Sequence, residues 1–455
     1  MRDIPLPHIN LQKGWPSRRL IPREHVQAAA EATLTDPDRG IDALLYGPNK
    51  GDPALRERCA EWLSGLYGLS VVPERICITA GASANLASIM QAFSDPVYTR
   101  RVWMAEPTYF LACTIFEDAG FQGRMEGVPE DDEGLDVEWL RSHIESVDAE
   151  TKANTETEAS PQAYKTIPTY RKLYRHIIYC VPTFSNPRGR SYTIKRREEL
   201  VRLARQVDAL LITDDCYDFL LWDVQDPGPS SEIREPQSRS INEQRKLHPP
   251  PRLTDIDRIL PGGDEVWGNA VSNASFSKVI GPGMRCGWAE ATPQFIIRLN
   301  QTGSILSGGA PAQFASTVIE HVLRTGRLED HLVNTLIPTY RTRAARLRRA
   351  VQQTLGPMGV TIDSDNGTDG IIGGFFLYIT LPVEFNVDNL AELALDKYNL
   401  RVLAGARMAV KGSKHLSSIV SQGIRLSWSW EEEEQIVQGI ARLAKAMNDP
   451  ELVKN

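Results

Sequence analysis

A lysine flanked by hydroxyl and guanidinium side chains is the residue of this chain best suited to covalent chemistry. Lys278 follows an extended run, Val271–Ala274, and precedes a Gly/Pro turn. A lysine amine at a strand end can form a Schiff base with a carbonyl compound. Ser275, Ser277 and Arg285 offer hydroxyl and guanidinium donors to phosphate oxygens. The segment therefore predicts a reactive lysine beside a phosphate, although by itself it is equally compatible with an ordinary lysine in a surface turn.

A second segment has the composition of an anion-binding turn. The run from Thr79 to Leu86 consists of small residues and leads from an apolar strand into a helix. A helix N-terminus offers unpaired N–H groups and the positive end of its dipole to an anion. Gly81, Ala82 and Ser83 occupy that turn. An ordinary helix cap has the same composition, so this motif alone leaves both interpretations open.

The elements that must position these residues alternate along the chain. Short apolar runs and helical stretches follow one another as far as about Trp288. The clearest are strands over Ile76–Ile78, Arg101–Met104, Ile177–Val181 and Leu210–Thr213, and a helix over Ile194–Gln206. This alternation predicts an α/β fold with a mostly parallel central sheet flanked by helices. After Thr292 helical periodicity dominates, and the later pattern predicts a smaller α+β domain.

The same pattern divides the chain into two domains. Residues 46–324 are expected to form the large domain, and residues 1–45 with 325–455 the small one, which carries an N-terminal substrate loop. Residues 149–162 and 225–264 are polar and rich in Pro, Ser, Glu or Thr. Both stretches are predicted to be surface insertions or loops.

Composition excludes several classes of function. The 455 residues include 51 Lys and Arg and 58 Asp and Glu, which gives a net charge of −7. A broadly acidic chain is a poor match to a nucleic-acid-binding protein. No apolar stretch approaches the roughly 20 residues of a membrane-spanning helix, and a cytoplasmic location is expected. The six cysteines form no CxxC pair, which indicates reduced, mostly buried thiols and no metal site.

The lysine motif carries a family resemblance. Ser-x-Ser-Lys followed by Pro-Gly-x-Arg-x-Gly resembles the fold type I, class I/II pyridoxal-phosphate aminotransferases, among them the kynurenine and 2-aminoadipate aminotransferases. The resemblance can be followed from about Asn10 to Leu443. It implies pyridoxal 5′-phosphate as cofactor and Lys278 as its covalent anchor and catalytic base. The implied phosphate ligands are Gly81, Ala82, Ser83, Ser275, Ser277 and Arg285.

Three further motifs match the family in order. Tyr109, after Ala-Glu-Pro-Thr, would stack on the cofactor ring. Asn186, in Asn-Pro-x-Gly, would donate to the cofactor's phenolic oxygen, and Tyr217 would do so beside it. Asp214 would pair with the pyridine nitrogen and keep it protonated. Asp215 is a rival for that role, but the spacing to Tyr217 favours Asp214.

The resemblance also implies a substrate site. Arg425, in Gly-Ile-Arg-Leu, would bind the substrate α-carboxylate as a fork, close to Asn186. Phe376 occupies the position of a pocket-lining aromatic. Lys13 and Gly14 replace a common Gly-Gly pair in the N-terminal loop, where Lys13 either selects an acidic side chain or faces solvent.

The implied activity is transfer of an amino group from an L-amino acid to a 2-oxo acid such as 2-oxoglutarate by a ping-pong mechanism. Tyr46 would reach the cofactor phosphate of a partner subunit, which implies a homodimer with shared active sites. The alternatives are another pyridoxal-phosphate reaction, such as decarboxylation, elimination or carbon–carbon bond formation, and a non-catalytic aminotransferase-like regulator. The amino donor stays open among acidic, aromatic, branched and 2-aminoadipate-like substrates.

Overall fold

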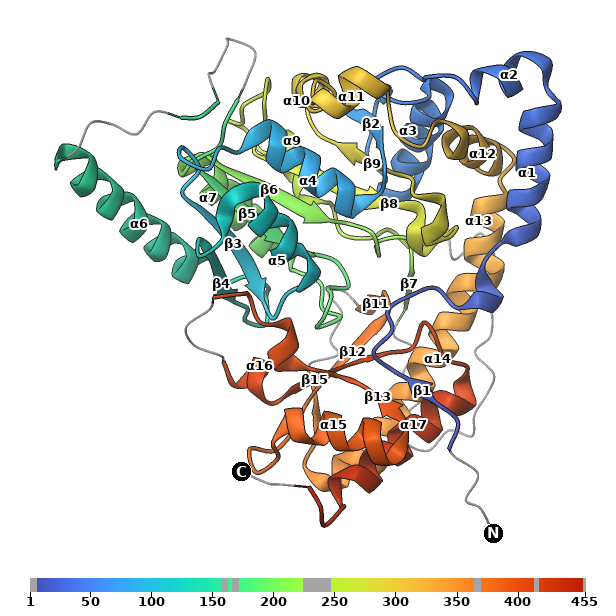
Figure 1. Ribbon diagram of the computed structural model, residues 1–455, viewed down its shortest axis with the longest axis vertical. Helices are drawn as coiled ribbons and strands as arrows, with labels where there is room; N and C mark the ends of the chain where they lie inside the picture. Colours follow the sequence, from blue (N-terminus) through green and yellow to red (C-terminus); the bar gives the residue numbers. More distant parts are fainter. Residues whose placement is uncertain are drawn as a thin grey trace.

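Two sheets organise the computed structural model, which describes residues 6–157, 163–165, 172–223, 247–363, 370–412 and 417–452 (Figure 1). The large sheet has seven strands, in the spatial order β2 (Ile76–Thr79), β9 (Gly287–Glu290), β8 (Ala270–Ser275), β6 (Ala209–Asp214), β5 (His176–Cys180), β3 (Arg101–Glu106) and β4 (Met125–Pro129). The smaller sheet has four, in the order β10 (Thr361–Ile362), β12 (Phe376–Thr380), β15 (Gly423–Ser427) and β14 (Leu403–Ala404).

The large sheet is mostly parallel, which confirms the predicted α/β class. From β4 to β8 each strand runs parallel to its neighbour, while β9 is antiparallel to both β8 and β2. Strand residues alternate between faces, so Ile177 and Tyr179 of β5 belong to one apolar core and Ile178 and Cys180 to another. Both faces are therefore buried, as continuous apolar strands require.

Helices cover both faces of this sheet. One core contains side chains of α4 (Ala82–Phe93), α5 (Leu111–Phe116) and α10 (Pro293–Leu299). The opposite core contains side chains of α6 (Val137–Thr157), α7 (Ile194–Gln206) and α9 (Leu253–Ile259).

The smaller antiparallel sheet packs with elements from both ends of the chain. In Figure 1 the blue N-terminal segment with β1 (Ile9–Asn10) lies among the orange and red C-terminal elements, where β1 pairs with β13 (Leu400–Arg401). The helices of this part are α14 (Ile337–Ala350), α15 (Val387–Tyr398), α16 (Ser418–Ser421) and α17 (Glu433–Met447). The predicted domain boundaries at residues 46 and 324 stay a prediction.

The remaining helices pack outside the two sheets, and one further strand pair completes the fold. They are α1 (Arg23–Thr35), α2 (Pro37–Asp42), α3 (Pro53–Tyr67), α11 (Gly303–Gly308), α12 (Gln313–Arg324), α13 (Arg327–His331) and the paired strands β7 (Leu221–Asp223) and β11 (Ile371–Gly373). All six cysteines are free and buried, which confirms the prediction from their spacing. No helix in the described ranges is long and apolar enough to cross a membrane.

The two predicted loops are partly wrong. Residues 149–157 form the end of α6, because Ala, Glu and Lys have high helix propensities. Within 225–264, α9 is helical, and Leu253 and Ile256 are buried in the core beneath the large sheet. Polarity averaged over the segment concealed these apolar positions. Residues 158–162 and 225–246 lie outside the described residues.

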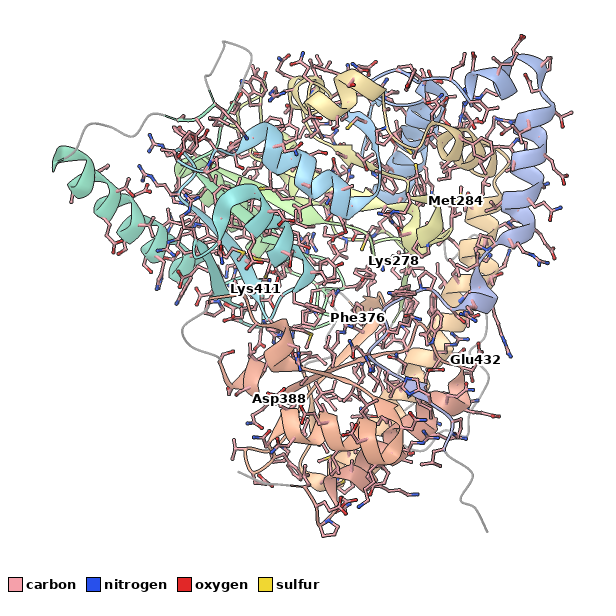
Figure 2. The ribbon with its side chains drawn as sticks, viewed as in Figure 1. Lys278, Met284, Phe376, Asp388, Lys411 and Glu432 are labelled. Atoms are coloured by element: carbon pink, nitrogen blue, oxygen red, sulfur yellow. The ribbon has the colours of Figure 1, made fainter. Side chains whose placement is uncertain are left out.

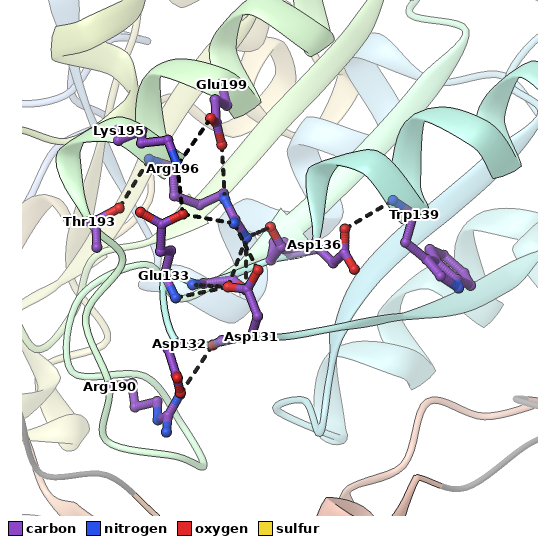
Figure 3. A network of polar contacts seen from close by, with 12 residues as sticks. Asp131, Asp132, Glu133, Asp136, Trp139, Arg190, Thr193, Lys195, Arg196 and Glu199 are labelled. Atoms are coloured by element: carbon purple, nitrogen blue, oxygen red, sulfur yellow. Dashed lines mark hydrogen bonds and ion pairs between the residues drawn. The ribbon is translucent and has the colours of Figure 1, made fainter.

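A polar network fixes the loops around α7 (Figure 3). Arg196 pairs with Asp131 at 2.8 Å and with Glu199 at 3.1 Å. The Thr193 side chain accepts a hydrogen bond from the Arg196 backbone N–H and caps the helix. Because α7 follows the loop after β5, these contacts hold the connection that carries Asn186.

Candidate active site

The carboxyl ends of the parallel strands meet at one cavity of about 490 Å³. Ligands of open α/β sheets bind at this edge. The predicted site residues that line the cavity are Lys13, Gly14, Ala82, Ser83, Tyr109, Asn186, Asp214, Tyr217, Ser275, Ser277, Lys278, Arg285, Phe376 and Arg425. Positions from both ends of the sequence are thus brought together. Figure 2 shows two of the lining residues, Lys278 and Phe376, where the parts of the two sheets meet.

Lys278 ends a short 3-10 turn that directly follows β8. Ser275 caps this turn, since its Oγ accepts from the Ser277 backbone N–H at 3.1 Å. The Lys278 Nζ donates to the Gly14 carbonyl at 3.2 Å. Burial lowers the pKa of Lys278, because a charged ammonium is costly away from water. A larger fraction of the amine is therefore unprotonated and nucleophilic.

The turn before α4 forms a second wall of the site. Gly81 has φ of +88°, a backbone conformation that favours glycine. A Cβ at Gly81 would lie 3.2 Å from Arg285 Nη2 and 3.6 Å from Ser275 Oγ. The Asn273 side chain ties β8 to this turn by donating to the Ala82 carbonyl at 2.9 Å. The first N–H groups of α4, one guanidinium and one hydroxyl thus converge.

Asp214 ends β6 and faces the cavity. Its Oδ2 accepts from the Tyr179 hydroxyl at 3.3 Å, and its buried Oδ1 has no hydrogen-bond partner within the described residues. Burial raises the pKa of Asp214 to about 6. Asp215 does not line the cavity, and its carboxylate accepts instead from Ser272 and Thr213 at 2.5 and 2.7 Å. Only the first of the two aspartates is therefore available to a ligand in the cavity.

Arg425 lies on β15 at the side of the cavity formed by the smaller sheet. Its Nη1 donates to Asn186 Oδ1 at 2.6 Å and its Nη2 to the Gln12 carbonyl at 2.5 Å. The Phe376 ring centroid lies 4.2 Å from the guanidinium carbon. Burial lowers the pKa of Arg425 to about 10. The guanidinium is thus held in place without a carboxylate partner, and its Nε is unpaired within the described residues.

Aromatic rings line the rest of the cavity. Tyr217 packs edge-on against Phe376, with ring centroids 5.7 Å apart. Burial raises the pKa of Tyr109 and of Tyr217, which keeps both phenols protonated as hydrogen-bond donors. Cys216 also lines the cavity.

The N-terminal segment closes the site. A Cβ on Gly14 would approach Phe376 Cζ to 2.5 Å, so glycine is needed there. The Lys13 Nζ lies 4.1 and 3.7 Å from the ring centroids of Trp15 and Trp430. Lys13 therefore lines the cavity beside these two rings, and its selection of an acidic side chain stays a prediction.

Tyr46 is a predicted site residue that lies elsewhere. Its side chain is 86% exposed, and it does not line the cavity of its own chain.

The cavity fits a planar, phosphorylated, cationic-ring cofactor. A reactive amine, an anion-binding turn and an unpaired carboxylate oxygen are all present in it. Their arrangement at the carboxyl edge of a mostly parallel sheet, beside a smaller antiparallel sheet, defines the fold type I class of pyridoxal-phosphate enzymes. The chain belongs to the aminotransferase class I and II family, whose sequence profile matches residues 9–419. It is a pyridoxal-phosphate-dependent transferase of amino groups.

Similarity to individual proteins agrees with this assignment. The chain is 33% identical over 451 residues to the uncharacterized protein YER152C of Saccharomyces cerevisiae, covering 95% of each. It is 26% identical over 444 residues to aromatic-amino-acid aminotransferase 1 of Thermococcus litoralis, covering 97% of this chain and 88% of that one. The fold matches LysN, an alpha-aminoadipate aminotransferase from Thermus thermophilus crystallised with N-(5′-phosphopyridoxyl)-L-leucine. The TM-score is 0.71 at 23% identity, over 97% and 92% of the chains.

Several residues around the cavity escaped the sequence analysis. Tyr179 lies inside an apolar strand run, and Gln12 contributes its carbonyl to Arg425, so neither has a signature. Arg401 lines the cavity from β13 and had no motif around it. Cys216 lies within the Asp-Asp-Cys-Tyr motif, whose spacing was a usable signal.

Proposed function

We propose that the protein moves the amino group of an L-amino acid to a 2-oxo acid, such as 2-oxoglutarate, in two half-reactions that use the same cavity. In the first, the donor leaves as its 2-oxo acid. In the second, the acceptor takes up the amino group and leaves as an amino acid. The observation that carries this proposal is the presence of Lys278 and Arg425 in one cavity.

Arg425 binds the α-carboxylate of both substrates. Its guanidinium is planar and can donate two parallel hydrogen bonds to a carboxylate, which lysine cannot do. Asn186 and Phe376 orient the guanidinium plane before the substrate arrives. Preorganisation of this kind lowers the ordering cost of binding.

The cofactor is held by residues already oriented in the cavity. When bound, pyridoxal phosphate supplies an electron-withdrawing ring that takes up the electron pair left at the substrate Cα. Asp214 Oδ1 holds the proton on the pyridine nitrogen, and Asn186 and Tyr217 donate to the phenolic oxygen. Gly81, Ala82, Ser83, Ser275, Ser277 and Arg285 bind the phosphate, and Tyr109 covers one face of the ring.

Lys278 moves the proton. In the first half-reaction its Nζ would take the proton from the substrate Cα and deliver it to the cofactor carbon that carries the amino group, and in the second it would move a proton the opposite way, which makes it the general base and general acid of each half-reaction. The burial that lowers its pKa makes the neutral amine available for this task. The Gly14 carbonyl orients the amine between transfers.

Two copies of the chain share their sites through Tyr46. Its exposed side chain belongs to a loop with exposed apolar neighbours, including Leu44 at 70% and Leu45 at 59% exposure. Exposed apolar residues gathered in one segment indicate a protein–protein contact. In a homodimer this tyrosine reaches the cofactor phosphate of the partner.

The test uses the purified protein loaded with pyridoxal phosphate. A panel of L-amino acids is incubated with 2-oxoglutarate, and both products are quantified. Glutamate and the new 2-oxo acid are expected in equal amounts, with parallel lines in double-reciprocal plots. Lys278→Ala is expected to abolish turnover and the mass gain on the Lys278 peptide after borohydride reduction. Release of carbon dioxide or ammonia in place of glutamate would contradict the proposal and favour another pyridoxal-phosphate reaction.

A further inference from the structure

Two cationic side chains at the cavity have no task in the chemistry described above. Five cationic side chains line the cavity, and Asp214 is the single described carboxylate that does so. Lys278 provides the amine, Arg285 faces the phosphate turn and Arg425 takes the α-carboxylate. Lys13 and Arg401 are left over. Each has no ion pair within the described part of the chain.

We propose that Arg401, assisted by Lys13, forms a subsite for a second carboxylate, so that the preferred substrates are amino acids and 2-oxo acids with an acidic side chain. This inference rests on the proposed aminotransferase function and names its substrate class. It assigns to Arg401 a role in specificity.

Arg401 is placed by backbone pairing. It lies on β13, where its carbonyl accepts hydrogen bonds from Leu11 N at 2.9 Å and Gln12 N at 3.2 Å. The Gln12 carbonyl in turn accepts from Arg425. The Arg401 backbone and the Arg425 side chain therefore contact the same two-residue piece of backbone, and both side chains line the same cavity. A substrate with carboxylates at both ends can engage one guanidinium with each.

Lys13, which lines the same cavity, is held by two indoles. Its Nζ contacts the faces of Trp15 and Trp430, whose planes are 88° apart. Cation–π contact stabilises the ammonium without neutralising its charge. The ammonium can still donate a hydrogen bond to a ligand in the cavity that Lys13 lines. A substrate with a neutral side chain would not compensate the positive charges of Lys13 and Arg401.

The measurement is the ratio of kcat/KM for L-glutamate to that for L-glutamine, which differ in charge but hardly in shape. The wild type is expected to prefer glutamate. Arg401→Gln should lower the ratio about 10-fold. This is the low end of the effect of losing a hydrogen bond to a charged group, and we expect the low end because Arg401 is exposed. Arg401→Lys should retain part of the preference, and Lys13→Gln should lower it less than Arg401→Gln does.

The matched control is Arg407→Gln. Arg407 is an exposed arginine six positions further along that does not line the cavity. This variant removes the same charge and should leave the ratio unchanged. An equal fall in both variants would assign the effect to net charge and overturn the subsite.

A binding experiment separates failure of the subsite from failure of the function. Calorimetry compares glutarate with pentanoate, which has one carboxylate. Tighter binding of glutarate that is lost in Arg401→Gln supports the subsite even if no donor is transaminated. If transamination proceeds but the wild type prefers glutamine, or Arg401→Gln changes neither the ratio nor glutarate binding, the subsite is wrong while the proposed function stands.

Discussion

Replacement of Asp214 by asparagine should stabilise the cofactor-free protein while it abolishes activity. In the proposed site Asp214 pairs with a cofactor nitrogen, and in the cofactor-free protein its Oδ1 is buried and unpaired within the described residues. Ionising such a group costs free energy. The amide of the variant would keep the shape and accept the Tyr179 hydrogen bond, but it would carry no charge.

The magnitude and its pH dependence follow from the pKa. Burial raises the pKa of Asp214 from 3.8 to about 6 in the folded protein. The folded state therefore binds this proton more tightly than the unfolded state, and stability falls as pH rises from about 4 to 6. At about 1.4 kcal/mol per pH unit, the full difference is about 3 kcal/mol. Because Asp214 faces the cavity, water there reduces the cost, and we expect about 1–3 kcal/mol.

The assay is urea unfolding of the cofactor-free wild type and Asp214→Asn between pH 4 and 8. The variant should gain stability relative to the wild type progressively above pH 4, and the difference should reach a plateau above about pH 7. Asp396→Asn removes an exposed carboxylate and should shift the free energy of unfolding by less than about 0.5 kcal/mol. Equal or lower stability of Asp214→Asn at about pH 7.5 would refute the electrostatic reasoning.

Three further outcomes are expected. Arg425→Lys should raise KM for donor and acceptor about 10- to 100-fold, since a point charge replaces a two-pronged guanidinium; steady-state kinetics with an unchanged KM would contradict this. Arg188→Met should lower the free energy of unfolding by about 3 kcal/mol, because Arg188 is buried between Asp363, at 2.5 Å, and Glu130, at 3.3 Å. Urea unfolding measures this loss, and a value below about 1 kcal/mol would argue against it. Tyr46→Ala should weaken cofactor binding about 10-fold although Tyr46 lies outside its own cavity, as measured by pyridoxal-phosphate titration at concentrations where sedimentation reports a dimer. Unaltered affinity in the dimer would argue against shared sites.

Helices with complete local signals were predictable from the sequence. In α3, Asp52 caps the start by accepting from Leu55 N at 2.9 Å, Pro53 occupies the first turn, and Gly68 ends it with φ of +66°. Strand β9 was not predicted, because four residues without periodicity become a strand only when β8 and β2 lie on either side. Helix α9 was taken for a loop because its apolar positions are diluted by the prolines before it.

The site divides in the same way. Residues within a motif, such as Lys278, Asn186 and Asp214, could be proposed because their types and spacing are fixed in the chain itself. Residues that hold them could not. Tyr179 reaches Asp214 from a neighbouring strand, and Gln12 reaches Arg425 with a backbone carbonyl from a segment 413 positions away. Such contacts exist only after the sheets have formed.

The unpaired polar groups of the site have a common consequence. Asp214 Oδ1 and Arg425 Nε are buried, belong to groups of opposite charge, and each lacks a partner within the described residues. Both side chains line the cavity in which we propose that a cationic ring and an anionic carboxylate bind. The folded protein therefore carries an electrostatic cost that binding of cofactor and substrate relieves. Anything that binds the folded state alone stabilises it. In the proposed site the charge of Asp214 weakens the cofactor-free chain and strengthens its affinity for the cofactor, so a variant that removes this charge should raise stability only at the expense of binding.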